Sequence, residues 1–108
     1  MPTYNKLVRD KIPEIIERKG GTYKIEKLDE VKYIQELKAK LKEELTEYLK
    51  SGNDVDAAME LADILEVMHS LSIIHGRTIE DIEAIRKQKY IERGGFEGQI
   101  YLFEAEDN

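Results

Sequence analysis

The segment AMELADILEVMHSL, residues 58–71, decides the fold. Its apolar residues occupy nearly every position of a helical wheel, and a helix that is apolar all round is normally buried all round. The same segment nevertheless carries acids, and two of them, Glu60 and Asp63, are spaced i and i+3, which places them on one face of the helix. Because burying an isolated carboxylate is costly, either this face of the helix is not buried or a positive charge lies beside it.

A second long helix precedes this one and forms a hairpin with it. We expect helices over residues 29–50 and 54–75, and Asp29 is a typical N-cap for the first of them. The sequence SGND at 51–54 has the composition of a tight turn. Two long helices joined by so short a turn must lie antiparallel.

The first helix of this hairpin is amphipathic, with a single apolar stripe. Glu44 lies on the flank of that stripe, and Glu47 lies one step further round the wheel. With Glu60 and Asp63 they would gather four carboxylates along one seam. Two like charges about 4 Å apart repel by roughly 4 kcal/mol at an effective dielectric constant of 20, and several such terms are comparable with the whole stability of a small domain, about 5–15 kcal/mol. A divalent cation relieves this repulsion, and an all-carboxylate ligand set suits Mg²⁺ or Mn²⁺ rather than zinc.

The rest of the chain adds smaller elements. We predict a short helix over residues 10–19, a third long helix from Thr78 to about Arg93, and short strands at 22–28 and 99–106 that can pair with each other. The chain has 108 residues, of which 37% are charged and 7% aromatic, and this composition favours one all-α domain over residues 1–108. The helix over residues 54–75 has more apolar circumference than one partner helix can cover, which favours a homo-oligomer.

The composition also excludes several functions. The chain has no Cys, so disulfides, thiolate catalysis and cysteine zinc sites are excluded. Its formal net charge of −6 argues against binding to a nucleic acid polymer, which requires an excess of Lys and Arg. The opening MPTYNKLVRDKIPEII has no signal-peptide pattern, and no apolar run is long enough to span a membrane. We therefore expect a cytoplasmic protein.

The four acids have the spacing of a known enzyme signature. Glu44-x-x-Glu47, twelve intervening residues and Glu60-x-x-Asp63 resemble the motif of the MazG-type all-α nucleoside triphosphate pyrophosphohydrolases, a superfamily that includes the phosphoribosyl-ATP pyrophosphohydrolases. The doublet formed by Glu43 and Glu44 also matches the EExxE form of that motif. The resemblance implies helical protomers whose hairpins build a four-helix core in a homodimer or homotetramer. It also implies Mg²⁺-dependent hydrolysis of a nucleotide between the α and β phosphates, which gives a monophosphate and pyrophosphate.

The resemblance also assigns roles to residues. Carried over by position, it makes four acids the metal ligands: Glu44, Glu47, Glu60 and Asp63. One of the first two, Glu44 or Glu47, can instead orient the attacking water as the general base. The phosphates require cations as well, and the basic candidates lie on the third helix and in the N-terminal segment: Lys89, Arg93, Lys6 and Arg9.

Other interpretations stay open. Phosphoribosyl-ATP is the alternative substrate. YNKLVRDKIPEII and the RGGF sequence at 93–96 resemble the house-cleaning type of the superfamily more than the histidine-pathway type, and this resemblance implies a nucleoside triphosphate. Glu66-x-x-His69 has the form of a di-iron helix motif, but it lies on a different face from Glu60 and Asp63. Finally, the acids can form salt bridges with Lys38, Lys40 and Lys42 in a non-catalytic helical interaction module.

Overall fold

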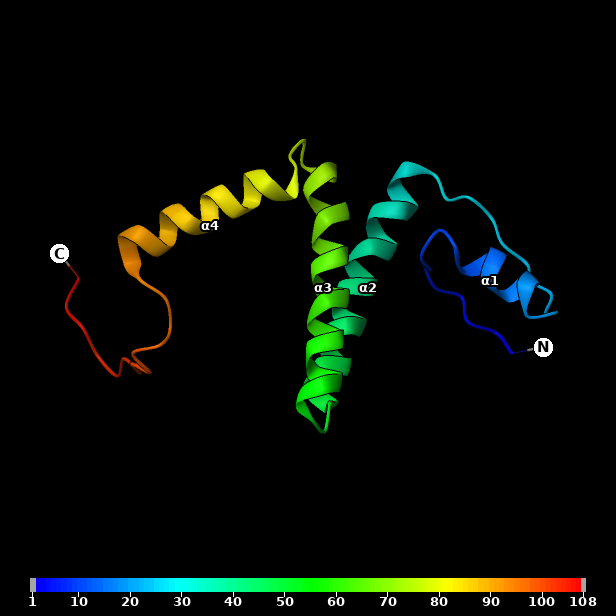
Figure 1. Cartoon of the computed structure of the whole chain (residues 1–108). Coiled ribbons are helices and arrows are strands. Elements are labelled where there is room, and N and C mark those ends of the chain that lie inside the picture. The colour runs from blue at the N-terminus through cyan, green and yellow to red at the C-terminus, as the bar shows by residue number, and fades with distance from the viewer. Residues whose placement is uncertain (1, 108) are drawn as a thin grey trace.

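The structure is a computed structural model that describes residues 2–107. Its regular elements are α-helices, in the order α1 (Ile12–Arg18), α2 (Glu30–Lys50), α3 (Asp54–Ile74) and α4 (Ile79–Arg93). Helices α2 and α3 form a central antiparallel hairpin, and α1 and α4 project from opposite sides of it (Figure 1). The predicted all-α class and the predicted hairpin are therefore confirmed. Between residues 2 and 107, none of the helices combines the length and apolar character that a transmembrane span requires.

The three long helices begin where side chains can cap them. The Asp29 carboxylate accepts a hydrogen bond of 2.8 Å from the backbone N–H three residues on, and Asn53 does the same for α3 at 2.9 Å. At α4, the Thr78 hydroxyl and the Asp81 carboxylate each accept from the other's backbone N–H, which forms a complete capping box. Each cap supplies an acceptor for an N–H group that has no partner within the helix. This local chemistry explains why the expected starts agree with the structure to within a residue.

Helix α3 ends at a glycine that turns the chain toward α4. Gly76 has a φ of +70°, in the left-handed region that residues with a Cβ rarely adopt. Its N–H donates to the carbonyl of Ile73, and the N–H of Arg77 donates to the carbonyl of Ser72. This pair of bonds is the Schellman motif, which satisfies carbonyls at the end of a helix.

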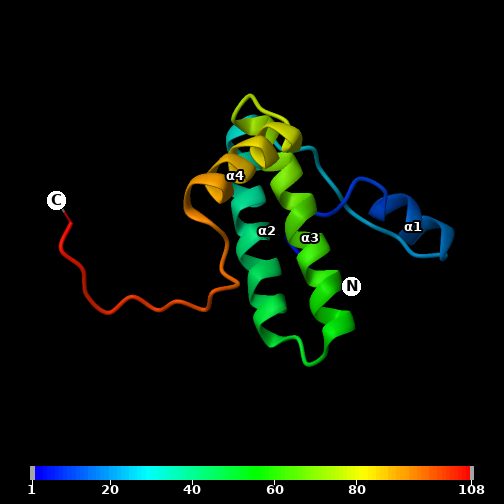
Figure 2. The same cartoon turned by 60° about the vertical axis from the view of Figure 1, so that its left-hand side comes forward.

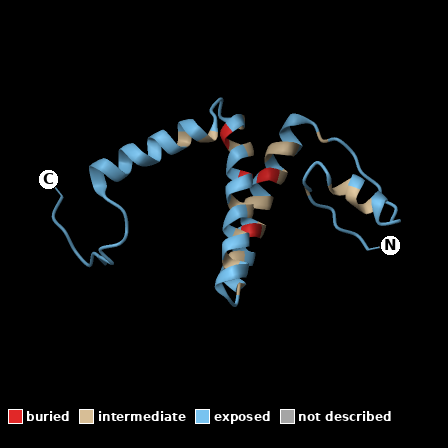
Figure 3. Cartoon of the chain, viewed as in Figure 1, coloured by how far each residue is buried: buried red, intermediate tan, exposed pale blue. Residues whose placement is uncertain are grey.

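The buried residues that the structure describes belong to the hairpin. Among residues 2–107 they are Leu37 and Glu44 on α2 and Val67 and Ser72 on α3, and Figure 3 colours the buried positions of these two helices red. The hairpin remains a pair of neighbouring rods when the view is turned (Figure 2). Since so few side chains are buried, the apolar core of a single chain is thin.

The two expected strands are not formed. Residues 22–28 and 99–106 contain neither helix nor strand, and they lie on opposite sides of the hairpin in Figure 1. The alternation of side chains in TYKIEKL is compatible with a strand, but a strand is stable only beside a neighbouring strand that accepts its hydrogen bonds. No such neighbour lies next to either segment in the described part of the single chain.

Candidate metal centre

Three of the four predicted acids converge at the hairpin seam. Glu44 comes from α2, and Glu60 and Asp63 come from α3, one turn apart. One carboxylate oxygen of each residue lies within 4.8 Å of the corresponding oxygens of the other two. Glu44 is only 8% exposed, and Glu60 and Asp63 are half-buried. We call these three residues the carboxylate cluster.

Glu60 is the member of the carboxylate cluster whose negative charge is least stabilised. Its Oε2 atom is buried and has no hydrogen-bond partner. The pKa of Glu60 is raised, first because its carboxyl can share a proton with Glu44, then by desolvation, and then by the negative charges of Glu44, Asp63 and Glu47. A buried oxygen without a partner, surrounded by like charges, is a position that a cation would stabilise.

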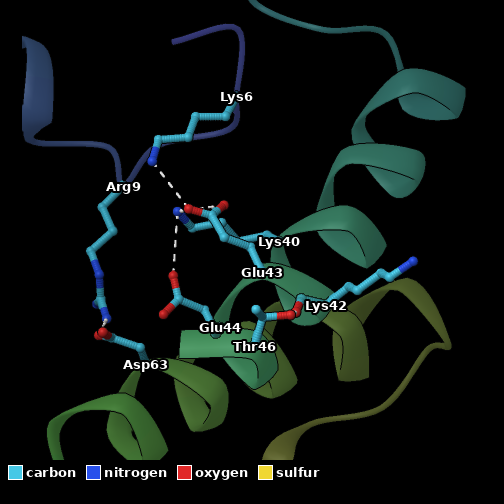
Figure 4. A network of polar contacts seen from close by, with 8 residues as sticks. All are labelled: Lys6, Arg9, Lys40, Lys42, Glu43, Glu44, Thr46 and Asp63. Atoms are coloured by element: carbon cyan, nitrogen blue, oxygen red, sulfur yellow. Dashed lines mark hydrogen bonds and ion pairs between the residues drawn. The ribbon is translucent and has the colours of Figure 1, made fainter. Parts of the chain in front are cut away.

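Basic side chains already compensate part of this charge. The guanidinium of Arg9 donates to Oδ1 of Asp63 at 2.7 Å, and the ammonium of Lys40 lies 3.4 Å from Oε1 of Glu44. Figure 4 shows both pairs from close by. No ion pair reaches Glu60 from any residue between 2 and 107. The carboxylate cluster is therefore neutralised at two members and uncompensated at the third.

Glu47, the fourth predicted ligand, lies at the edge of the cluster. It is exposed and is not among the acids whose oxygens converge. Three residues of helix rotate a side chain by about 300°, so Glu47 lies about 60° round the helix from Glu44 and off the seam. It instead lines an open pocket of about 250 Å³ at the hairpin turn, together with Glu60, Lys50 and Met59. Glu47 therefore borders the carboxylate cluster on the side where this pocket opens.

The four basic candidates fall into two pairs. Lys6 and Arg9, in the N-terminal segment, contact the hairpin: Lys6 donates to Glu43 at 3.1 Å and Arg9 donates to Asp63. Lys89 and Arg93 are exposed on α4, which packs against α3 and then extends away from the hairpin (Figure 1). The single chain thus brings the N-terminal pair to the cluster and leaves the α4 pair away from it.

The structure also places residues that the alternative interpretations used. Glu66 and His69 are exposed and belong to no possible metal-binding cluster within residues 2–107 of one chain, so a di-iron site would need the same motif from a second copy. Of the lysines offered as salt-bridge partners, Lys40 does pair with Glu43 and Glu44. Sequence reasoning missed Lys50, although its position three residues after Glu47 gave a signal that it could share the edge of the site.

The donor set fits a hard divalent cation. It consists of three carboxylate oxygens on two helices. One of the three residues, Glu60, also has a buried oxygen without a hydrogen bond. Mg²⁺ and Mn²⁺ prefer such oxygen ligands. No protein-family model, no curated protein and no solved structure matches this chain. The functional inference therefore depends on the residues of this site.

Proposed function

We propose that this protein is a Mg²⁺-dependent nucleotide pyrophosphohydrolase that cleaves a nucleoside triphosphate between its α and β phosphates. The observation that carries the proposal is the convergence of Glu44, Glu60 and Asp63 within 4.8 Å, with one Glu60 oxygen buried and unpartnered. The MazG-type spacing of these acids supports the same conclusion. Mn²⁺ is expected to replace Mg²⁺ because it accepts the same ligands.

The carboxylate cluster would hold the cation, which supplies charge neutralisation and polarises phosphoryl oxygens when bound. Glu47 is better placed than Glu44 to be the general base, since Glu47 is exposed beside the pocket whereas Glu44 is buried and paired with Lys40. In the reaction, a water oxygen bonds to phosphorus, the water proton passes to Glu47, and the bridging P–O bond breaks to release pyrophosphate. This assignment keeps the acid that binds the cation separate from the acid that takes the proton.

Cations beside the cluster are the candidates for holding the substrate phosphates. Lys6 and Arg9 are close to the cluster through their bonds to Glu43 and Asp63. Lys89 and Arg93 can contribute only if a second copy of the chain brings its α4 to the site. Self-association through the exposed apolar surface of α3 is part of the proposal, with a homodimer or homotetramer as the assembly.

A nucleotide panel tests this proposal. We expect pyrophosphate release from one class of NTP or dNTP in Mg²⁺ or Mn²⁺ and none in EDTA. Glu60→Gln and Asp63→Asn should each lower kcat/KM by more than about 100-fold, since loss of even an outer-shell partner of a metal commonly costs about 10–100-fold. Glu66→Gln is the matched control, because Glu66 lies on the same helix, is exposed and is outside the cluster. Full activity of Glu60→Gln would contradict the proposal.

The same assays separate the alternatives. Release of pyrophosphate from phosphoribosyl-ATP alone would assign the protein to the histidine-pathway reaction. The interaction-module alternative has one supporting observation, the pairing of Lys40 with Glu43 and Glu44. It predicts no hydrolysis, and it also predicts a melting temperature that is the same in EDTA and in Mg²⁺, because a ligand that does not bind the folded state cannot stabilise it.

A further inference from the structure

The N-terminal segment, residues 2–10, lies next to the carboxylate cluster. Helix α1, which follows this segment, does not pack against the hairpin. Residues 2–10 have no regular secondary structure apart from a bend and the start of a turn, and α1 makes no backbone contact with another helix. Two cations hold the segment to the hairpin: Lys6 bonds Glu43 on α2, and Arg9 bonds Asp63 on α3 (Figure 4). We call residues 6–9 the basic strap.

The bonds of the basic strap are of a kind that is easily exchanged. Both ion pairs join partly exposed side chains, with exposed fractions of 42% and 34% for Lys6 and Glu43 and of 56% and 40% for Arg9 and Asp63. Exposed ion pairs contribute little to stability because water and salt screen them. The basic strap is therefore held on the hairpin by two ion pairs, and a more highly charged ion can displace either of them.

Arg9 is bound to a carboxylate that the cation would also use. Asp63 is a member of the carboxylate cluster, and its Oδ1 accepts the guanidinium at 2.7 Å. A divalent cation on the same carboxylate would bring two positive centres together, which weakens the hold of Asp63 on Arg9. Lys6 differs, because its partner Glu43 is not a member of the cluster. Of the two basic side chains of the strap, Arg9 therefore competes with the metal for a ligand and Lys6 does not.

The Arg9 guanidinium, once released, has a new partner in the phosphates of the nucleotide. A triphosphate carries several negative charges, and Arg binds phosphate through paired N–H donors. We propose that the basic strap neutralises Asp63 and Glu43 in the metal-free chain, and that cation binding to the carboxylate cluster frees Arg9 to bind the phosphates of the nucleotide. This inference rests on the proposed function. It makes Arg9 a competitor of the metal and a ligand of the substrate in turn.

Mn²⁺ titration followed by electron paramagnetic resonance, with the full-length protein, tests the competition directly. Arg9→Gln should bind Mn²⁺ more tightly than the wild type, by up to about fivefold, the equivalent of one exposed ion pair. Lys6→Gln removes the same charge without freeing a metal ligand, so it measures the long-range field alone and should give a smaller gain. Arg18→Gln, whose partner Glu14 lies within α1, should give no change.

A second measurement tests the phosphate half of the proposal. With Mn²⁺ saturating, the affinity for a non-hydrolysable α,β-imido triphosphate should fall in Arg9→Gln and stay unchanged in Arg18→Gln. Unchanged or weaker Mn²⁺ binding by Arg9→Gln would overturn the strap while leaving the metal site standing, and an unchanged analogue affinity would overturn its phosphate role. Absence of Mn²⁺ binding by the wild type would instead overturn the proposed function itself.

Discussion

The α2–α3 hairpin and the arms on either side of it, residues 2–28 and 77–107, differ in what they bury. All the buried residues within 2–107 belong to the hairpin, whereas aromatic side chains of the C-terminal arm are open to solvent, with Phe96 97% and Phe103 88% exposed. The carboxylate cluster is likewise assembled by the hairpin alone. The comparison teaches that one hairpin is sufficient to gather the acids, and that it is insufficient to cover the apolar surface of the chain.

The two helices of the hairpin differ in how much apolar surface they leave exposed. Helix α2 turns one apolar stripe toward α3, and Leu37 there is 3% exposed. Helix α3 is apolar on most of its faces. It leaves Leu61 and Leu65, which lie about 40° apart on one side of the helix, 50% and 49% exposed. One partner helix covers one side of α3, so the remaining apolar side is where a second copy of the chain is expected to pack.

The largest effect is expected from a charge placed on that uncovered side. Light scattering should give the wild type at least twice the 12.6 kDa mass of one chain. Leu65→Glu should reduce this mass to that of a single chain and lower the free energy of unfolding by about 2 kcal/mol per protomer. Phe103→Ser is the matched change in an arm and should alter stability by less than about 0.5 kcal/mol. A monomeric wild type would break the comparison, because α3 would then need no further partner.

A smaller effect is expected from pH in the metal-free protein. The pKa of Glu60 is raised on folding, mainly by its proximity to Glu44. Between the ordinary and the raised pKa, the folded state binds more protons than the unfolded state, so stability falls as the pH rises through this window and is retained below it. Urea unfolding in EDTA between about pH 4 and pH 7 measures this slope.

Glu60→Gln is the control for this slope, since it removes the titrating group and should flatten the curve. The pKa of Glu43 is lowered, first by its hydrogen bond from Lys6, so its stabilising contribution is lost as the pH falls and lies in a different window. A wild-type curve that matches Glu60→Gln at every pH would show that folding of the hairpin does not raise the pKa of Glu60.

The elements that follow from local chemistry were predictable. The caps at Asp29, Asn53 and Thr78 lie within a few residues of the groups they bond, so the helix starts could be predicted from the sequence. The approach of Glu60 and Asp63 to Glu44 followed from helical periodicity together with one tight turn. The exposure of Glu47 was the limit of that reasoning, because a rotation of about 60° decides between the seam and the rim.

The arms could not be predicted in the same way. The predicted strands at 22–28 and 99–106 depended on a pairing between distant segments, and the single chain does not bring those segments together. The ion pairs of Lys6 and Arg9 link residues 37 and 54 positions apart, so no local periodicity indicates them. The direction of α4 is set at the turn after Gly76, which separates Lys89 and Arg93 from the cluster.

The most direct test of the metal centre is a crystal of the full chain grown or soaked in Mn²⁺, with anomalous diffraction recorded near the manganese edge. The account predicts an anomalous peak bounded by oxygens of Glu44, Glu60 and Asp63, with no such peak in crystals of Glu60→Gln. A wild-type map in which that position holds no manganese, or in which the three carboxylates point separately into solvent, would contradict it.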